Sequence, residues 1–283
     1  MNQYKMTGTD IPTEYTMSIL QSRNPAMSIL QSERAFGTEQ ARVMTLGGTL
    51  TATSILLSIV AVVGILVWQS LNAGYAAGNS MPGWIMPVMI GTLIGGIAVS
   101  FIIYRNPKSA PIIAPLHAAL EGAFVGVATF YIPMQYMAVE PGATNPTAML
   151  AVQAAVATFG VTAAMLLGYA TGVIRVGPIF QKIMVTALIG LVVYVVAIML
   201  LGFMGIHIWN GFADAGPMGI GFSVLIIGLA SMFLILDFQF IEKGIDAQAP
   251  KYMEWVGAWG LMITLVWLYI EILRLLAKMR SSD

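Results

Sequence analysis

Seven stretches of the chain are long and apolar enough to cross a lipid bilayer as helices, and this limits the fold more than any other feature. A spanning helix needs about 20 mostly apolar residues, because the bilayer core offers no water to backbone polar groups. Charged residues make up only 9% of the 283 residues, against about 25% in a soluble domain. The predicted spans are 48–71, 84–104, 112–137, 147–173, 183–206, 217–241 and 257–279. The sequence therefore predicts an all-α integral membrane protein, with a polar tail over 1–47 and a seven-helix transmembrane bundle over 48–283.

Basic residues in the connections predict how these helices are oriented. The tail and the connections after the second, fourth and sixth spans carry Lys or Arg, whereas the other connections carry none. Because short cytoplasmic loops are enriched in basic residues, the tail is predicted to be cytoplasmic. Lys278 and Arg280 disagree with this pattern, since seven full crossings leave them outside. Either the last helix breaks the rule or it does not cross fully, and we favour the full crossing.

The composition argues against several kinds of function. The chain has no cysteine and two histidines, which excludes thiolate catalysis and a multi-histidine metal site. Its formal net charge is zero, so nothing indicates a basic face for nucleic acid. No Gly-x-Gly-Asp pattern of an intramembrane protease lies near an acid of the spans. The only lysine of the last span is at its end, whereas a retinal protein needs a lysine in the middle of that span. We therefore expect no enzymatic activity, no nucleic-acid partner and no cofactor beyond transient Ca²⁺.

The few charges inside the predicted spans are the candidate functional residues. Away from the ends of the spans, they are Glu121, Asp237, Glu271 and Arg274. An ionisable group in hydrocarbon is costly, so it marks a functional site by default. In the last span, polar and aromatic residues recur at spacings of three and four, which places them on one helix face: Thr264, Trp267, Glu271, Arg274 and Lys278. This stripe is predicted to face the interior of the bundle.

Whether Asp237 and Glu271 meet depends on where the last helix enters the membrane. If it enters at Tyr252, Glu271 lies near the far side and the two carboxyls are too far apart. If the amphipathic segment KYMEWVGAWG, residues 251–260, lies partly in the interface, the crossing starts later and the two acids share a site in the cytoplasmic half. We state the shared site as a geometric hypothesis.

A shared site would act as a pH sensor. Two carboxyls in contact hold one proton between them and titrate in two coupled steps. Protonated, the pair would clasp the last two helices together; deprotonated, it would repel itself and offer oxygens to a cation such as a weakly bound Ca²⁺. The alternative is purely structural, with Arg274 neutralising Glu271 three residues away.

Other charged residues carry weaker expectations. Glu121 lies four residues after His117 near the cytoplasmic end of its span, where a local His–Glu hydrogen bond and a place on an ion path are both open. His207 and Asp214 fall in an outer connection and are expected to be solvated.

Pairs of glycines four residues apart predict close helix packing in three spans, because they let backbones approach. These pairs are Gly91 and Gly95, Gly122 and Gly126, and Gly168 and Gly172.

Four stretches of the sequence resemble the Bax inhibitor family, also called the transmembrane BAX-inhibitor-motif or lifeguard family, and look most like its bacterial branch. They are RNPAM in the tail, APLHAALEGAFVG in the third span, LILDFQFIEKG in the sixth, and the terminal block APKYMEWVGAWGLMITLVWLYIEILRLLAKMR. The resemblance implies a bundle in which helix 7 is central, surrounded by the other six. It also implies location in the bacterial inner (cytoplasmic) membrane.

The resemblance further implies a di-carboxylate latch between the last two helices, tied to a pH-dependent calcium leak. Asp237 and Glu271 match the two acids of the latch, although the second acid is Asp in the better-known members. Glu121 matches a carboxylate of an EG motif in this branch.

Two functions follow as expectations. The first is a pH-sensitive cation leak channel, with calcium as the cation, gated by the di-carboxylate of Asp237 and Glu271. The second is a regulatory membrane protein that binds and modulates a membrane protease or a stress-response partner without conducting ions. A measurement of calcium flux into liposomes distinguishes these two functions, because only the leak channel would conduct calcium.

Overall fold

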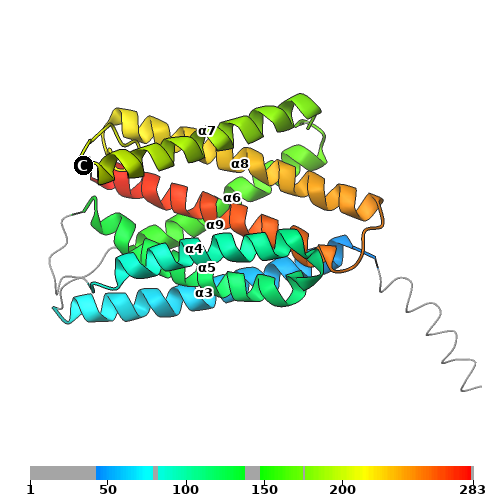
Figure 1. Cartoon of the computed structure of the whole chain (residues 1–283), viewed down its shortest axis with the longest axis horizontal. Coiled ribbons are helices and arrows are strands. Elements are labelled where there is room, and N and C mark those ends of the chain that lie inside the picture. The colour runs from blue at the N-terminus through cyan, green and yellow to red at the C-terminus, as the bar shows by residue number, and fades with distance from the viewer. Residues whose placement is uncertain (1–42, 79–81, 138–146, 175, 282–283) are drawn as a thin grey trace, which may run out of the picture. The chain divides into compact units, whose positions relative to one another are not determined.

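A computed structural model of the chain describes residues 43–78, 82–137, 147–174 and 176–281, and the bundle begins at Met44. In that part of the chain, seven helices are long and apolar enough to span a bilayer, which confirms the predicted fold class. They are α3 (Leu46–Ala76), α4 (Ile85–Arg105), α5 (Ala110–Met134, preceded by the 3₁₀ turn η1, Pro107–Ser109), α6 (Thr147–Ala170), α7 (Pro178–Phe203), α8 (Pro217–Asp246) and α9 (Met253–Arg280). Figure 1 shows their arrangement. Nearly all of the predicted tail lies outside the described residues.

Each predicted span corresponds to one helix, and local chemistry explains several of the starts. Pro178 and Pro217 occupy the first turn of α7 and α8, where the missing N–H costs no hydrogen bond. The Thr45 hydroxyl caps α3 by accepting a hydrogen bond from the Gly48 amide at 3.0 Å. The last helix begins at Met253 and runs unbroken to Arg280, so no separate interfacial segment precedes it.

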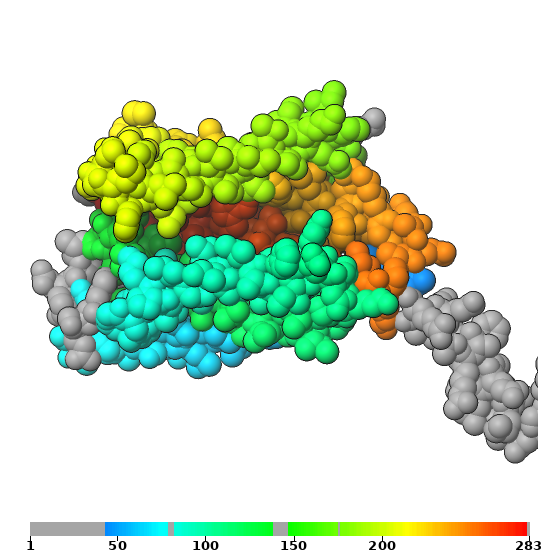
Figure 2. All heavy atoms as spheres, viewed as in Figure 1, coloured from blue at the N-terminus to red at the C-terminus, as the bar shows by residue number. Residues whose placement is uncertain are grey.

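The helix α9 is the most deeply buried of the seven, which confirms its central place. Its main packing partners are α3, α5, α6 and α8. The resemblance implied that all six other helices would surround it, and here the structure differs: α4 packs mainly on α5, and α7 packs on α8. Figure 2 shows the consequence, a groove between α7 and α4 with the red α9 on its floor.

The helices α3 and α5 pack closely against each other, and one of the predicted glycine pairs makes this packing possible. A Cβ built on Gly122 would lie 2.8 Å from the Val63 Cβ and 2.9 Å from the Val60 carbonyl oxygen. A Cβ on Gly126 would lie 2.5 Å from the Gly64 carbonyl oxygen. A side chain at either position would therefore collide with the backbone of α3.

The other two glycine pairs do not carry a comparable contact. A Cβ on Gly91 would meet no atom within 4 Å, and one on Gly95 would meet only the Leu120 side chain, at 3.3 Å. Gly168 lies against Ile174 of its own connection, and Gly172 has a φ of +71° just past the end of α6. The prediction of close helix packing is thus confirmed for the α5 pair alone.

We predict that Gly122→Ala lowers the thermal stability of the protein in detergent, whereas Gly91→Ala leaves it unchanged or raises it. Both changes gain about 1 kcal/mol of helix propensity, but overpacking costs about 1–3 kcal/mol and applies only to Gly122. Thermal unfolding of the two variants measures the difference. Equal stability of the two variants would show that α3 and α5 are not tightly packed at Gly122.

Candidate functional site along the buried helix α9

The polar stripe of α9 faces the bundle interior, as predicted. Four of the polar or charged side chains of this helix are buried: Glu254, Thr264, Glu271 and Lys278. We call the end of the bundle that holds the α8–α9 connection (247–252) the inner end, and the end that holds the α7–α8 connection (204–216) the outer end. The stripe therefore runs from Thr264 to Lys278 at the outer end, and Glu254 lies before it on the same helix, at the inner end.

At the inner end, Glu254 ties the start of α9 to the start of α3. Its Oε1 accepts hydrogen bonds from the Thr45 amide at 3.0 Å and from the Thr45 hydroxyl at 2.8 Å. A carboxylate is stabilised there because it lies at the positive end of the α3 dipole. The segment 251–260, which we considered as an interfacial piece, is held inside the bundle by this contact, and its Trp255 and Trp259 pack against the core.

Asp237 of α8 lies beside α9 about one third of the way along it. A Cβ built on Gly260 would lie 3.6 Å from Asp237 Oδ1, so the carboxyl packs against the bare face of that glycine. The Thr264 hydroxyl, one turn further on, donates to the Gly260 carbonyl oxygen at 3.3 Å. The other oxygen of the Asp237 carboxyl, Oδ2, is buried and has no hydrogen-bond partner. An unpartnered buried carboxyl oxygen is unfavourable and is available to a proton or a cation.

His117 and Glu121 of α5 form a second polar group at a similar depth. The Trp259 indole donates a hydrogen bond to His117 Nδ1 at 2.6 Å, so a neutral ring carries its proton on Nε2. This Nε2 lies 3.3 Å from Glu121 Oε1, but in a geometry that makes no hydrogen bond. The sequence was compatible with a local His–Glu contact. The structure adds the hydrogen bond from Trp259, which holds His117 against α9.

Glu271 forms an ion pair with Arg274 on α9 itself. The Arg274 Nη1 lies 2.5 Å from Glu271 Oε1, and the guanidinium also covers the Phe212 ring, with 4.9 Å between its carbon and the ring centre. The second oxygen of Glu271, Oε2, is buried without a hydrogen-bond partner. The ion pair of Glu271 and Arg274, which was predicted as the purely structural alternative, is therefore present. It provides a partner for only one of the two Glu271 oxygens.

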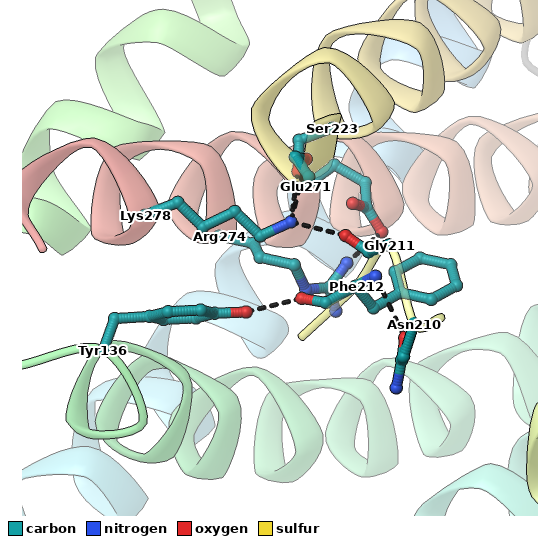
Figure 3. A network of polar contacts seen from close by, with 9 residues as sticks. Tyr136, Asn210, Gly211, Phe212, Ser223, Glu271, Arg274 and Lys278 are labelled. Carbon is teal, nitrogen blue, oxygen red and sulfur yellow. Dashed lines mark hydrogen bonds and ion pairs between the residues drawn. The ribbon is translucent and has the colours of Figure 1, made fainter. Parts of the chain in front are cut away.

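The outer end of the stripe is closed by residues of the α7–α8 connection (Figure 3). The Tyr136 hydroxyl donates to the Phe212 carbonyl oxygen at 2.5 Å, and the Lys278 ammonium donates to the Gly211 carbonyl oxygen at 2.6 Å. Asp214 braces the same connection by accepting from the Trp209 indole at 3.0 Å and from the Gly216 amide at 2.9 Å. The expectation that Asp214 is merely solvated was wrong, whereas His207 is exposed as expected.

The position of Lys278 also answers the question of the last crossing. Because its ammonium contacts the α7–α8 connection, α9 runs the whole length of the bundle from the inner end to the outer end. The full crossing that we favoured agrees with this path.

The structure does not bring Asp237 and Glu271 together. Asp237 lies beside Gly260, and about 16 Å of helix axis separates Gly260 from Glu271 at 1.5 Å per residue. No hydrogen bond joins the two carboxyls. The shared site required α9 to enter late, and the Glu254 contact with Thr45 fixes an early entry instead. The two acids face the same central helix at different depths.

The side chains that could bind a metal ion also lie apart from one another. Among the described residues, no cluster of three His, Asp or Glu side chains is placed to hold a metal ion. Ca²⁺ prefers six to eight oxygen ligands, so neither Asp237 nor Glu271 alone provides a tight site.

The sequence indicated the charged residues of the site, but it did not indicate their hydrogen-bond partners from distant parts of the chain. Nothing in the sequence connects Tyr136 with Phe212, or Glu254 with Thr45, because these pairs lie far apart in the chain. Lys278 could have been recognised, since it lies on the same predicted stripe as Glu271.

Comparison with known protein families matches residues 24–281 to the family described as Bax inhibitor 1 like. Searches of curated proteins and of solved structures found no match. The family match covers all seven spanning helices and the whole of the stripe on α9.

We predict that the ion pair of Glu271 and Arg274 is coupled. Glu271→Met or Arg274→Met alone leaves a charge in an apolar setting and should cost about 1–3 kcal/mol of unfolding free energy. The double variant removes both charges and should cost less than the sum of the two single changes. Unfolding of the four proteins in mixed micelles measures the coupling, and strictly additive costs would contradict it.

We also predict that Asp214 stabilises the fold only above acidic pH. The Gly216 amide and the Trp209 indole hold the pKa of its carboxyl below the ordinary value. A lowered folded-state pKa gives stability that is present above the unfolded value of about 4 and is lost as pH falls through the folded value. Asp214→Asn should therefore lower the melting temperature at about pH 7 and have less effect at about pH 3, and the exposed Asp246→Asn is the control. An equal effect at both pH values would contradict this role.

Proposed function

This chain belongs to the Bax inhibitor 1-like family, and on this premise we propose that it is a pH-sensitive cation leak channel, with calcium as the permeating ion. The proposal includes location in a bacterial inner membrane with the N-terminus in the cytoplasm. Asp237 and Glu271 are the acids that contact the ion, and Arg274, Glu121 and His117 are accessory to them.

One observation carries the proposal: two buried acids on or beside the central helix each keep an oxygen without a hydrogen-bond partner. These oxygens are Asp237 Oδ2 and Glu271 Oε2. Buried carboxylates in a purely structural role are normally fully satisfied, because each unpaired oxygen costs free energy. Protons and hard cations are the species that satisfy such oxygens. In a membrane, groups of this kind line ion and proton pathways.

The geometry favours two acids acting in series over a single shared latch. Asp237 faces Gly260, and Glu271 lies about three turns further towards the outer end. A cation moving along α9 would meet the two carboxylates one after the other. Successive weak sites suit conduction, because each site attracts the ion without trapping it.

The sign of the pH response follows from the charge of the carboxylates. A deprotonated carboxylate attracts a cation, and a protonated one does not. Leak is therefore expected to rise as pH rises through the range in which these acids lose their protons. In the proposed channel, Arg274 would oppose the flow of cations, because it occupies one oxygen of Glu271.

We predict that Asp237→Asn lowers calcium leak and flattens its pH dependence, since an amide mimics the protonated acid at every pH. The measurement is calcium entry into liposomes that hold an indicator dye, compared across acid and alkaline pH. Asp246→Asn is the matched control, because it makes the same chemical change at an exposed position of α8. Flux that is absent at every pH, or that is the same in wild type and Asp237→Asn, would contradict the channel. Absent flux would leave the regulatory membrane protein as the remaining function.

A further inference from the structure

Lys278 is a fully buried lysine whose ammonium lies among oxygen atoms. Its exposed fraction is 0%, which is rare for this residue type. The ammonium donates to the Gly211 carbonyl oxygen at 2.6 Å, the Gly219 carbonyl oxygen at 3.0 Å and the Ser223 hydroxyl at 2.9 Å. We call these three oxygens the outer oxygen cage, and Figure 3 shows the ammonium with its Gly211 and Ser223 partners.

The cage is built by close packing between the start of α8 and the connection before it. A Cβ on Gly219 would collide with the Asp214 carbonyl group, and a Cβ on Gly211 would lie 2.7 Å from the Phe222 ring. Ser223 is 1% exposed and one turn beyond Gly219. These contacts hold the two carbonyl oxygens and the hydroxyl in place around one point.

The chemistry of the cage is that of a small-cation site. Backbone carbonyl and hydroxyl oxygens are the groups that replace the water around a permeating cation. In this chain the position is filled by the protein's own cation, on a side chain of α9. The other charges of this region are Glu271 and Arg274 on α9 and Asp214 on the connection.

The cage lies on the outer side of Glu271. Lys278 is seven residues beyond Glu271 on the same helix, which is about two turns nearer the outer end. On the proposed path along α9, an ion that leaves Glu271 towards the outer end would meet the charges of Arg274 and Lys278 in turn.

We propose that the outer oxygen cage is a cation-binding site of the conduction path and that the Lys278 ammonium blocks it, so that Lys278 restricts the leak. This inference rests on the proposed channel function. It assigns the basal rate of leak to Lys278, while the acids Asp237 and Glu271 set its response to pH.

The test compares calcium leak of wild type with that of Lys278→Ala in dye-loaded liposomes. Removal of the ammonium leaves the cage open, and we expect the leak to rise about tenfold or more, because a fixed like charge a few ångströms away strongly repels a cation. Lys243→Ala, which changes an exposed lysine of α8, is the matched control and should leave the leak unchanged.

Two additions distinguish an opened cage from a loosened bundle. Propylammonium supplies the missing part of the lysine side chain and should block the leak of Lys278→Ala without affecting wild type. Ser223→Ala should raise the leak of wild type about twofold, because the ammonium loses one of its partners, but should lower the leak of Lys278→Ala, because the ion loses a ligand. The Ser223→Ala change in wild type also serves if Lys278→Ala fails to fold.

Each outcome decides the matter. A higher leak in Lys278→Ala that propylammonium blocks supports the proposal. A leak equal to wild type, or a higher leak that neither propylammonium nor Ser223→Ala reduces, overturns the proposal while the channel function stands. If Lys278→Ala does not fold, an unchanged leak in Ser223→Ala overturns it. If no protein of the series leaks at any pH, the channel function fails and this inference fails with it.

Discussion

Ionisable side chains are buried on α9, and their burial limits how the bundle can be built around this helix. An unpaired charge in the hydrocarbon layer costs several kcal/mol, so each such residue needs a partner or a function. Glu254 accepts a hydrogen bond from the start of α3, Glu271 forms an ion pair with Arg274, and Lys278 donates hydrogen bonds to the outer oxygen cage. These contacts fix the height of the helix in the bundle. Among the described acids, one buried oxygen of Asp237 and one of Glu271 have no hydrogen-bond partner, and the proposed function uses these two oxygens.

The two ends of α9 are built differently. At the inner end, Glu254 accepts hydrogen bonds from the capping residue of α3, and Trp259 holds His117 beside Glu121. At the outer end, basic groups hold a loop down, because Arg274 covers Phe212 and Lys278 binds the Gly211 carbonyl oxygen. The basic residues therefore lie between the acids and the outer end. In the proposed path, the acids Asp237 and Glu271 therefore lie inside the bundle, and the Lys278 ammonium blocks the outer end.

Hydropathy was sufficient to predict the seven helices, because the need to satisfy backbone groups in lipid acts locally along the chain. The inward face of α9 was also predictable, since its polar residues repeat at helical spacing. The separation of Asp237 and Glu271 was not predictable, because the depth of Glu271 depends on Glu254 and Thr45, which lie 209 residues apart. Likewise, only the folded chain places Tyr136 against the carbonyl of Phe212.

The distance between the carboxyl oxygens of Asp237 and Glu271 decides whether the two acids act in series or as one shared site. Experimental structures in lipid at acid and at alkaline pH would provide this distance. Acids that act in series should stay beyond direct contact, more than about 6 Å apart, at both pH values. Carboxyl oxygens within hydrogen-bond distance at either pH would contradict the account, because the acids would then form one shared latch.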